Sequence, residues 1–339
     1  MFEINYSDIS RNNTNNVFID VRSPKEFSEE TIPGAVNIPI FDNKERELIG
    51  TLYKNKSIEE AKRTGIDIAS KKLPAIYEEV AKYNVDHNHI YMFCSRGGFR
   101  SSALAPFFHA LNMSVLKLHG GYKNYRAFIR ENLPEISKDL QLVVLYGNTG
   151  TGKTHILNNL RDSGMNVLDL EGCANHRGSI LGSVGLGEAN SQKMFESLVY
   201  EQLENRTSNL VFVEGESKRI GKSLIPEFIF DKMINGIKLK ITAPMEKRVE
   251  IIQEDYVNGA DSELTEALNH MRNRLGNEKI DRYVSLVEAK DYSPIIKDLF
   301  INYYDPLYEK HKKEFVKTFE NLDSSDTATN IIQWIKEEK

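Results

Sequence analysis

Residues 142–154, LVVLYGNTGTGKT, decide the fold of the larger part of this chain. A short apolar run typical of a buried strand leads directly into a Gly-rich loop, and a helical pattern follows. The loop fits GxxxxGK(S/T) in full, in the strand-to-helix context that a phosphate-binding P-loop requires. Backbone N–H groups would face phosphate oxygens, Lys153 adds positive charge, and Thr154 is placed to coordinate magnesium. The predicted phosphate-binding residues are Gly147, Gly150, Gly152, Lys153 and Thr154.

Strand patterns continue beyond this loop, separated by helical stretches, at residues 166–170, 210–214 and 237–242. Alternating strands and helices predict a parallel α/β sheet. From Pro244 onward the pattern is mostly helical and charged. We therefore expect residues 134–339 to form an α/β domain like those of P-loop NTPases, with a helical C-terminal part.

The same alternation precedes residue 134. Short strands are expected at 17–21, 90–93 and 115–118, and helices at 99–111 and 122–130. The segment Glu131-Asn132-Leu133-Pro134 closes this first α/β unit, so residues 1–133 are predicted to form a separate domain.

A cysteine loop, Cys94-Ser95-Arg96-Gly97-Gly98-Phe99-Arg100, follows one of these strands and leads into a helix. The helix N-terminus, the backbone N–H groups of the glycine loop and the two arginines would stabilise a thiolate or a bound anion. A buried structural cysteine would need no such surroundings. The candidate catalytic residues are Cys94, Arg96, Gly97 and Arg100.

Two polar clusters follow strands of the second domain, at residues 171–179 and 214–221. Loops after the carboxyl ends of parallel strands face the ligand crevice of an open α/β sheet. Two pairs are candidates for metal handling, Asp169 with Glu171 and Glu214 with Glu216, and each pair could equally be a solvated strand end. Cys173 is expected to have no role in the site. The substrate-binding candidates are Asp169, Glu171, His176, Arg177, Glu214, Lys218 and Arg219.

The composition limits the class of protein. The chain of 339 residues is 40% hydrophobic and 27% charged, has a formal net charge of −5, and contains two cysteines. Two cysteines in unlike contexts predict reduced thiols and no disulfide framework. No apolar run reaches the length of a membrane span, and the first twenty residues lack a signal-peptide pattern. We expect a cytoplasmic protein without a membrane partner, and the charge neither requires nor excludes RNA.

From about Asn5 to Arg130 the sequence resembles the rhodanese family, through residues 19–27 (IDVRSPKEF), 32–39 (IPGAVNIP) and 119–122 (HGGY). The resemblance implies that Cys94 carries sulfur or selenium as a persulfide-type adduct. Many single-domain members have arginine where Phe99 stands. Five residues separate Cys94 from Arg100, a spacing shared with cysteine phosphatases, although Phe93 replaces the histidine usual before the phosphatase cysteine.

The whole chain resembles the tRNA 2-selenouridine synthase family, in which a rhodanese domain is fused to a P-loop domain. Signatures beyond the two general motifs are residues 45–54 (ERELIGTLYK), 96–98 (RGG), 170–172 (LEG), 174–179 (ANHRGS) and 304–308 (YDPLY). The resemblance implies a transferase that replaces the sulfur of wobble 2-thiouridine in tRNA by selenium. It also implies selenophosphate and geranyl diphosphate as co-substrates, a selenophosphate synthetase as the supplier, and an S-geranylated intermediate. Magnesium is a further candidate ion, at Thr154 of the P-loop.

Cys94 is then expected to carry selenium, and the P-loop to hold the prenyl diphosphate. An ATP-dependent rhodanese-type tRNA sulfurtransferase is an alternative, because the P-loop motif does not distinguish a nucleotide from a prenyl diphosphate. A nucleotide-binding regulator and a cysteine phosphatase are further alternatives. The RNA-binding candidates, taken from the resemblance rather than from charge, are Lys222, Arg272 and Arg274, beside Lys218 and Arg219.

Overall fold

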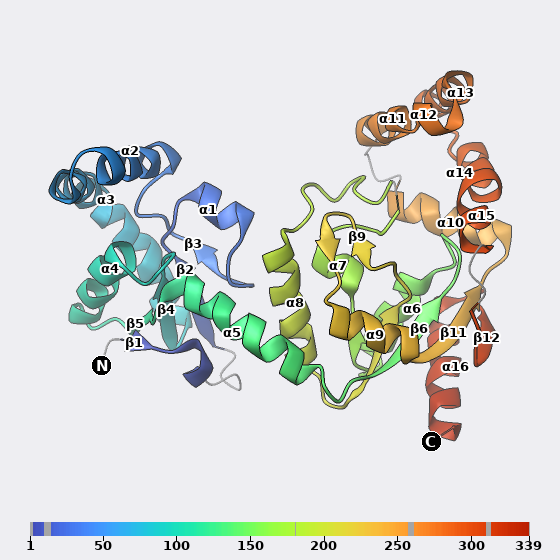
Figure 1. Ribbon diagram of the computed structural model, residues 1–339, viewed down its shortest axis with the longest axis horizontal. Helices are drawn as coiled ribbons and strands as arrows, with labels where there is room; N and C mark the ends of the chain where they lie inside the picture. Colours follow the sequence, from blue (N-terminus) through green and yellow to red (C-terminus); the bar gives the residue numbers. More distant parts are fainter. Residues whose placement is uncertain (1–2, 10–14, 180, 257–260, 310–312, 339) are drawn as a thin grey trace. The chain divides into compact units, whose positions relative to one another are not determined.

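The computed structural model describes residues 3–9, 15–179, 181–256, 261–309 and 313–338. It divides into two compact units, Met1–Leu133 and Pro134–Lys339, and each unit has its own five-stranded sheet. Figure 1 shows the strands of each unit lying among helices. None of the helices within the described ranges combines the length and the apolar character that crossing a membrane demands.

The first unit has the strand order β1-β5-β4-β2-β3, and every pairing is parallel. The predicted strands at 17–21, 90–93 and 115–118 correspond to β2, β4 and β5. Its strands are β1 (Glu3–Ile4), β2 (Asn16–Asp20), β3 (Val36–Asn37), β4 (His89–Phe93) and β5 (Val115–Leu118). Its helices are η1 (Tyr6–Asp8), α1 (Pro24–Glu29), α2 (Asn43–Asn55), α3 (Ile58–Asp86), α4 (Phe99–Ala110) and α5 (Gly121–Ile136).

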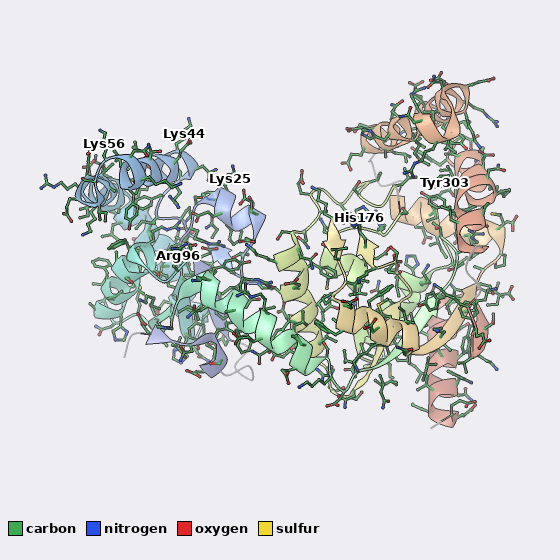
Figure 2. All side chains as sticks on the ribbon, viewed as in Figure 1. Lys25, Lys44, Lys56, Arg96, His176 and Tyr303 are labelled. Atoms are coloured by element: carbon green, nitrogen blue, oxygen red, sulfur yellow. The ribbon has the colours of Figure 1, made fainter. Side chains whose placement is uncertain are left out.

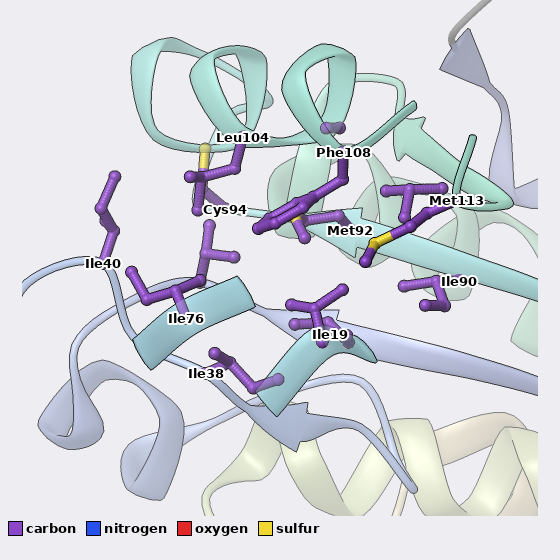
Figure 3. Packing of buried hydrophobic residues seen from close by; sticks show 14 of the residues in the cluster. Ile19, Ile38, Ile40, Ile76, Ile90, Met92, Cys94, Leu104, Phe108 and Met113 are labelled. Carbon is purple, nitrogen blue, oxygen red and sulfur yellow. The ribbon is translucent and has the colours of Figure 1, made fainter. Parts of the chain in front are cut away.

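The core of the first unit places the cysteine loop. Strand β4 is buried from Ile90 to Phe93, as expected for a central strand of a parallel sheet covered on both faces. Figure 3 shows Met92 beneath Phe108 of α4 and Ile90 beneath Met113, with Cys94 beside Leu104. The strand and the helix thus fix both ends of the loop that carries Cys94.

The second unit has the strand order β12-β11-β6-β8-β7, again entirely parallel. Its strands are β6 (Gln141–Tyr146), β7 (Val167–Leu168), β8 (Leu210–Glu214), β11 (Ile237–Thr242) and β12 (Lys317–Glu320), with a small hairpin of β9 (Arg219–Ile220) and β10 (Ser223–Leu224). Its helices are α6 (Lys153–Asp162), α7 (Leu170–Ala174), α8 (Gln192–Glu204), α9 (Glu227–Asn235), α10 (Met245–Tyr256), α11 (Asp261–His270), α12 (Arg272–Leu275), α13 (Asn277–Glu288), α14 (Ser293–Leu299), the π-helix η2 (Phe300–Tyr304), α15 (Asp305–Glu309) and α16 (Ser324–Glu337).

Two sequence predictions for this unit need correction. The strand expected at 166–170 covers only Val167–Leu168, because Asp169 caps the short helix α7 by accepting a hydrogen bond from the Gly172 N–H at 2.8 Å. The C-terminal part is mostly helical, as predicted, but it also contains strand β12 at the edge of the sheet. This strand, KTFE, is polar and largely exposed, so it lacks the apolar pattern that reveals a buried strand.

A buried ion pair at the end of β2 gives a stability prediction. Arg22 donates two hydrogen bonds to the Asp20 carboxylate, at 2.7 and 3.0 Å, and both side chains are almost fully buried. Asp20→Ala would leave the Arg22 charge buried without its counter-charge, which typically costs about 3–5 kcal/mol. Urea unfolding should show this loss, whereas Lys71→Ala, which removes an exposed pair with Asp67, should change stability by less than about 1 kcal/mol. Equal effects of the two changes would contradict the assignment.

Candidate functional site

The cysteine loop is held in a closed shape by backbone contacts. The carbonyls of Cys94 and Ser95 accept hydrogen bonds from the N–H groups of Tyr122 and Lys123, both at 2.9 Å. Gly121 has φ +58°, and a Cβ atom there would lie 2.1 Å from the Cys94 carbonyl oxygen. Only glycine fits this approach, so the predicted HGGY turn forms the wall against which the loop closes.

The Cys94 sulfur lies in a polar cradle at the N-terminus of α4. Ser101 Oγ donates to Cys94 Sγ at 3.2 Å. Burial raises the pKa of the thiol, but the Ser101 hydroxyl and N–H, the Arg100 charge and the Arg96 N–H together lower the pKa below its usual value. The geometry therefore favours a thiolate, the reactive form of cysteine.

The pH dependence of Cys94 alkylation tests this cradle. Because the pKa is lowered, the rate should reach half its maximum at a lower pH than for free cysteine, whose pKa is about 8.5. Ser101→Ala should move the profile to higher pH, since it removes one donor to the thiolate. Cys173 serves as an internal control, because burial raises its pKa and its sulfur should remain unmodified. A Cys94 profile that coincides with that of free cysteine would disprove the effect.

The two loop arginines have different surroundings. Arg100 forms two hydrogen bonds to Glu26 of α1, at 2.6 and 3.1 Å. Burial raises the pKa of Glu26, yet Arg100, the Ser23 N–H and Arg46 lower it to about 2, so the carboxylate is ionised. Arg96 is exposed on the loop (Figure 2), where its side chain is accessible to an incoming anion. Gly97 has φ +61° and lies against the backbone of Gly120 and Gly121.

The P-loop joins β6 to α6, as the sequence predicted. Gly150 and Gly152 have φ of +79° and +80°, a conformation that other residues adopt at a cost. Lys153 Nζ lies within 3.1 Å of the Gly147 carbonyl oxygen, at the mouth of the loop. Thr154 Oγ1 donates to Glu214 Oε1 at 2.6 Å. These groups line a polar pocket at the N-terminus of α6, which we call the P-loop pocket; its lining residues include Thr149, Gly150, Gly152, Lys153, Thr154, Glu171, Arg177, Gly178, Ser179, Glu214, Glu216 and Ile252.

Three carboxylates meet in the P-loop pocket. Glu171, Glu214 and Glu216 each place an oxygen within 4.8 Å of the others. Burial, together with their mutual repulsion, raises the pKa of Glu171 and Glu214, and burial raises that of Glu216. Glu171, from the first predicted pair, thus lies with Glu214 and Glu216, the second predicted pair. Asp169 is not part of this cluster and instead caps helix α7.

The remaining substrate-binding candidates are dispersed. Arg177 lines the P-loop pocket and donates to the Val184 carbonyl at 2.8 Å. The buried His176 Nδ1 has no hydrogen-bond partner in the described part of the chain, and burial lowers the pKa of the ring. Figure 2 labels this residue near α7. Lys218 lines a larger neighbouring cavity of about 880 Å³, whereas Arg219 is exposed on β9.

The RNA-binding candidates make local contacts. Lys222 lies 3.7 Å from Glu188, and Arg272 lies 2.7 Å from Asp281. Arg274 donates to the Tyr303 hydroxyl at 2.8 Å. Their role in binding RNA stays a prediction.

Several site residues escaped the sequence analysis. The sequence did not single out Ser101, although its hydroxyl contacts the reactive sulfur. Glu26 was part of the quoted IDVRSPKEF motif, but its pairing with Arg100 depends on the fold. Buried Arg248 belongs to none of the sequence motifs. Its Nε donates a hydrogen bond to the Thr149 carbonyl of the P-loop at 2.9 Å, and its guanidinium forms an ion pair with Asp305. Asp305 lies in the 304–308 signature, which was the only part of this ion pair that the sequence motifs included.

Comparison with known protein families gives one match in each of the two units. Residues 140–339 match the family model described as "tRNA 2-selenouridine synthase AAA domain", and residues 7–128 match the rhodanese-like domain. A tRNA 2-selenouridine synthase of Marinobacter nauticus is 32% identical, covering 86% of this chain and 87% of that protein. Another, from Pseudomonas syringae pv. syringae, is 30% identical, covering 94% of each. Among solved structures, a shikimate kinase from Acinetobacter baumannii has a TM-score of 0.28 at 18% identity, covering 61% of this chain and 98% of that one.

Proposed function

The chain belongs to the tRNA 2-selenouridine synthase family, whose name implies a transferase acting on tRNA, and we propose that it exchanges sulfur for selenium through an S-geranylated intermediate. The observation that carries this proposal is the presence of two separate anion cradles, one built around a thiol and one around a P-loop lysine. A thiol suits selenium transfer, and a P-loop suits a diphosphate leaving group. Each cradle therefore serves one step.

In the first step the sulfur of wobble 2-thiouridine attacks C1 of geranyl diphosphate. A C–S bond forms, the C1–O bond breaks, inorganic diphosphate leaves, and the base loses its N3 proton. Lys153 and the N–H groups at the start of α6 stabilise the negative charge that develops on the diphosphate. The step converts a poor leaving group, a thiocarbonyl sulfur, into a better one, a thiolate.

In the second step selenium replaces the alkylated sulfur. The Cys94 thiolate attacks the selenium of selenophosphate, which a selenophosphate synthetase supplies; the Se–P bond breaks and phosphorus leaves with the electron pair as phosphite. The selenium of the S–Se adduct then attacks C2 of the base, and geranylthiolate leaves. Two equivalents of a thiol reductant then cleave the S–Se bond and are oxidised to a disulfide; their two protons go to the Cys94 sulfur and to the base, which is released as 2-selenouridine. The Ser101 hydroxyl and the N-terminus of α4 stabilise the thiolate form of this sulfur.

Magnesium fits the P-loop pocket. Carboxylate and hydroxyl oxygens are the ligands that this ion prefers, and Glu171, Glu214, Glu216 and Thr154 supply them. Burial, together with repulsion from neighbouring carboxylates, raises the pKa of Glu171 and Glu214, and a bound cation would favour their ionised forms. When bound, the ion would neutralise charge on the diphosphate.

The P-loop also suits the alternative, an ATP-dependent tRNA sulfurtransferase, and one assay separates the two. The protein is mixed with tRNA carrying 2-thiouridine and either geranyl diphosphate or ATP, and the released diphosphate or phosphate is measured. We expect diphosphate from geranyl diphosphate, with tRNA carrying unmodified uridine as the inactive control. Release of phosphate or diphosphate from ATP that depends on tRNA, with none from geranyl diphosphate, would support the sulfurtransferase instead.

A further inference from the structure

A second pocket opens beside the P-loop pocket, and its walls are largely apolar. They come from α10, α11, α14 and η2 and include Ile252, Leu264, Ile296, Leu299 and Phe300. The Tyr292 hydroxyl at its edge is already engaged, since it donates to Asp261 at 2.7 Å. We call this space the apolar pocket.

The apolar pocket adjoins the P-loop pocket. Thr149, Ser179 and Ile252 line both spaces. The loop also packs directly on the apolar wall, because a Cβ atom at Gly150 would lie 2.9 Å from Phe300 Cζ and 3.1 Å from Ile252 Cγ1. A ligand that places its phosphates in the P-loop would thus lie next to the apolar side chains of Ile252 and Phe300.

Arg248 fixes this wall to the P-loop. Besides its bond to the Thr149 carbonyl, its guanidinium forms two hydrogen bonds to Asp305, at 2.7 and 2.8 Å, and lies 4.1 Å from the centre of the Phe300 ring. Phe300 and Tyr304 belong to the π-helix η2, a rare conformation that is frequent at functional sites. The YDPLY signature therefore provides both the anchor, Asp305, and a wall residue, Tyr304.

From this arrangement we propose that the apolar pocket binds the hydrocarbon chain of the prenyl diphosphate, an inference that rests on the proposed function. A diphosphate head in the P-loop pocket with a hydrocarbon tail in the apolar pocket matches the polarity of both spaces. A nucleotide base there would leave its polar edges facing aliphatic side chains. The apolar pocket has a cavity volume of about 40 Å³ in this structure, less than a ten-carbon chain occupies. Binding therefore includes an outward movement of the side chains in the wall.

Chain-length preference tests the inference. Calorimetry on the full chain would compare geranyl diphosphate, the five-carbon dimethylallyl diphosphate and inorganic diphosphate. Burial of the additional carbons should make geranyl diphosphate bind on the order of 100-fold more tightly than dimethylallyl diphosphate. Ile296→Phe, which adds bulk to the apolar pocket at a residue that does not line the P-loop pocket, should reduce this ratio at least about tenfold without weakening the binding of inorganic diphosphate.

A matched pair of truncations provides the control. Leu264 and Leu268 are both buried on α11 in the same core cluster, but of the two only Leu264 lines the apolar pocket. Leu264→Ala should raise the affinity for the longer farnesyl diphosphate relative to geranyl diphosphate, whereas Leu268→Ala should not. An unchanged chain-length preference in Ile296→Phe and Leu264→Ala, with intact geranyl transfer, would overturn this inference alone. Failure of the wild-type protein to bind geranyl diphosphate would overturn the proposed function as well.

Discussion

Lys153→Ala is expected to lower geranyl transfer to tRNA about 10²–10³-fold, the usual effect of removing one preorganised group that stabilises developing charge. Lys153 lies at the mouth of the P-loop and lines its pocket, so its loss removes positive charge from the site where diphosphate leaves. The rate of formation of S-geranylated nucleoside, measured by mass analysis after digestion of the tRNA, checks the prediction.

Lys153→Ala should still catalyse the second step, the replacement of the alkylated sulfur by selenium. When it is given tRNA that is already S-geranylated, together with selenophosphate, selenouridine should form at nearly the wild-type rate, because the Cys94 loop is unchanged. Lys336→Ala, which removes an exposed lysine from α16, is the matched control and should affect neither step. Loss of both steps in folded Lys153→Ala protein would contradict the assignment of the P-loop to geranyl transfer.

Cys94→Ala is expected to abolish selenation while geranyl transfer continues, so that S-geranylated tRNA accumulates. The reason is chemical: alanine cannot form the S–Se adduct, whereas the P-loop pocket retains its lysine and carboxylates. Selenouridine and geranylated uridine are measured in the same digest. Cys173→Ala is the control, because this buried thiol has a raised pKa and no place in the proposed chemistry. Normal selenation by Cys94→Ala would contradict the selenium-carrying role.

Local sequence patterns predicted the parts of the molecule that are continuous in the chain. The P-loop and the cysteine loop each follow a strand and lead into a helix, as GxxxxGKT and the CSRGGFR segment indicated. The backbone of both loops depends on a few glycines with positive φ. The glycines themselves can be read from the sequence, and they indicate where the chain can adopt this conformation.

Contacts between distant segments could not be predicted in the same way. The carboxylate cluster joins Glu171 on α7 to Glu214 at the end of β8 and to Glu216 just after it. No local pattern indicates that Asp169 caps a helix while Glu216 joins the site. Arg248 and Asp305 are far apart in the sequence, so their pairing depends on the fold of the C-terminal helices. The polar edge strand β12 was not predicted for a different reason: its side chains are largely exposed, so the strand lacks the apolar pattern by which strands are identified.

The most direct test of the account is an ordered-addition experiment with the full chain and tRNA carrying wobble 2-thiouridine. The protein is first given geranyl diphosphate alone, the tRNA is re-isolated, and selenophosphate with a thiol reductant is then added with fresh protein. The account predicts S-geranyl-2-thiouridine after the first addition and its conversion to 2-selenouridine after the second, with neither product formed without protein. Selenation of 2-thiouridine without geranyl diphosphate, at the same rate as with it, would contradict the two-step exchange.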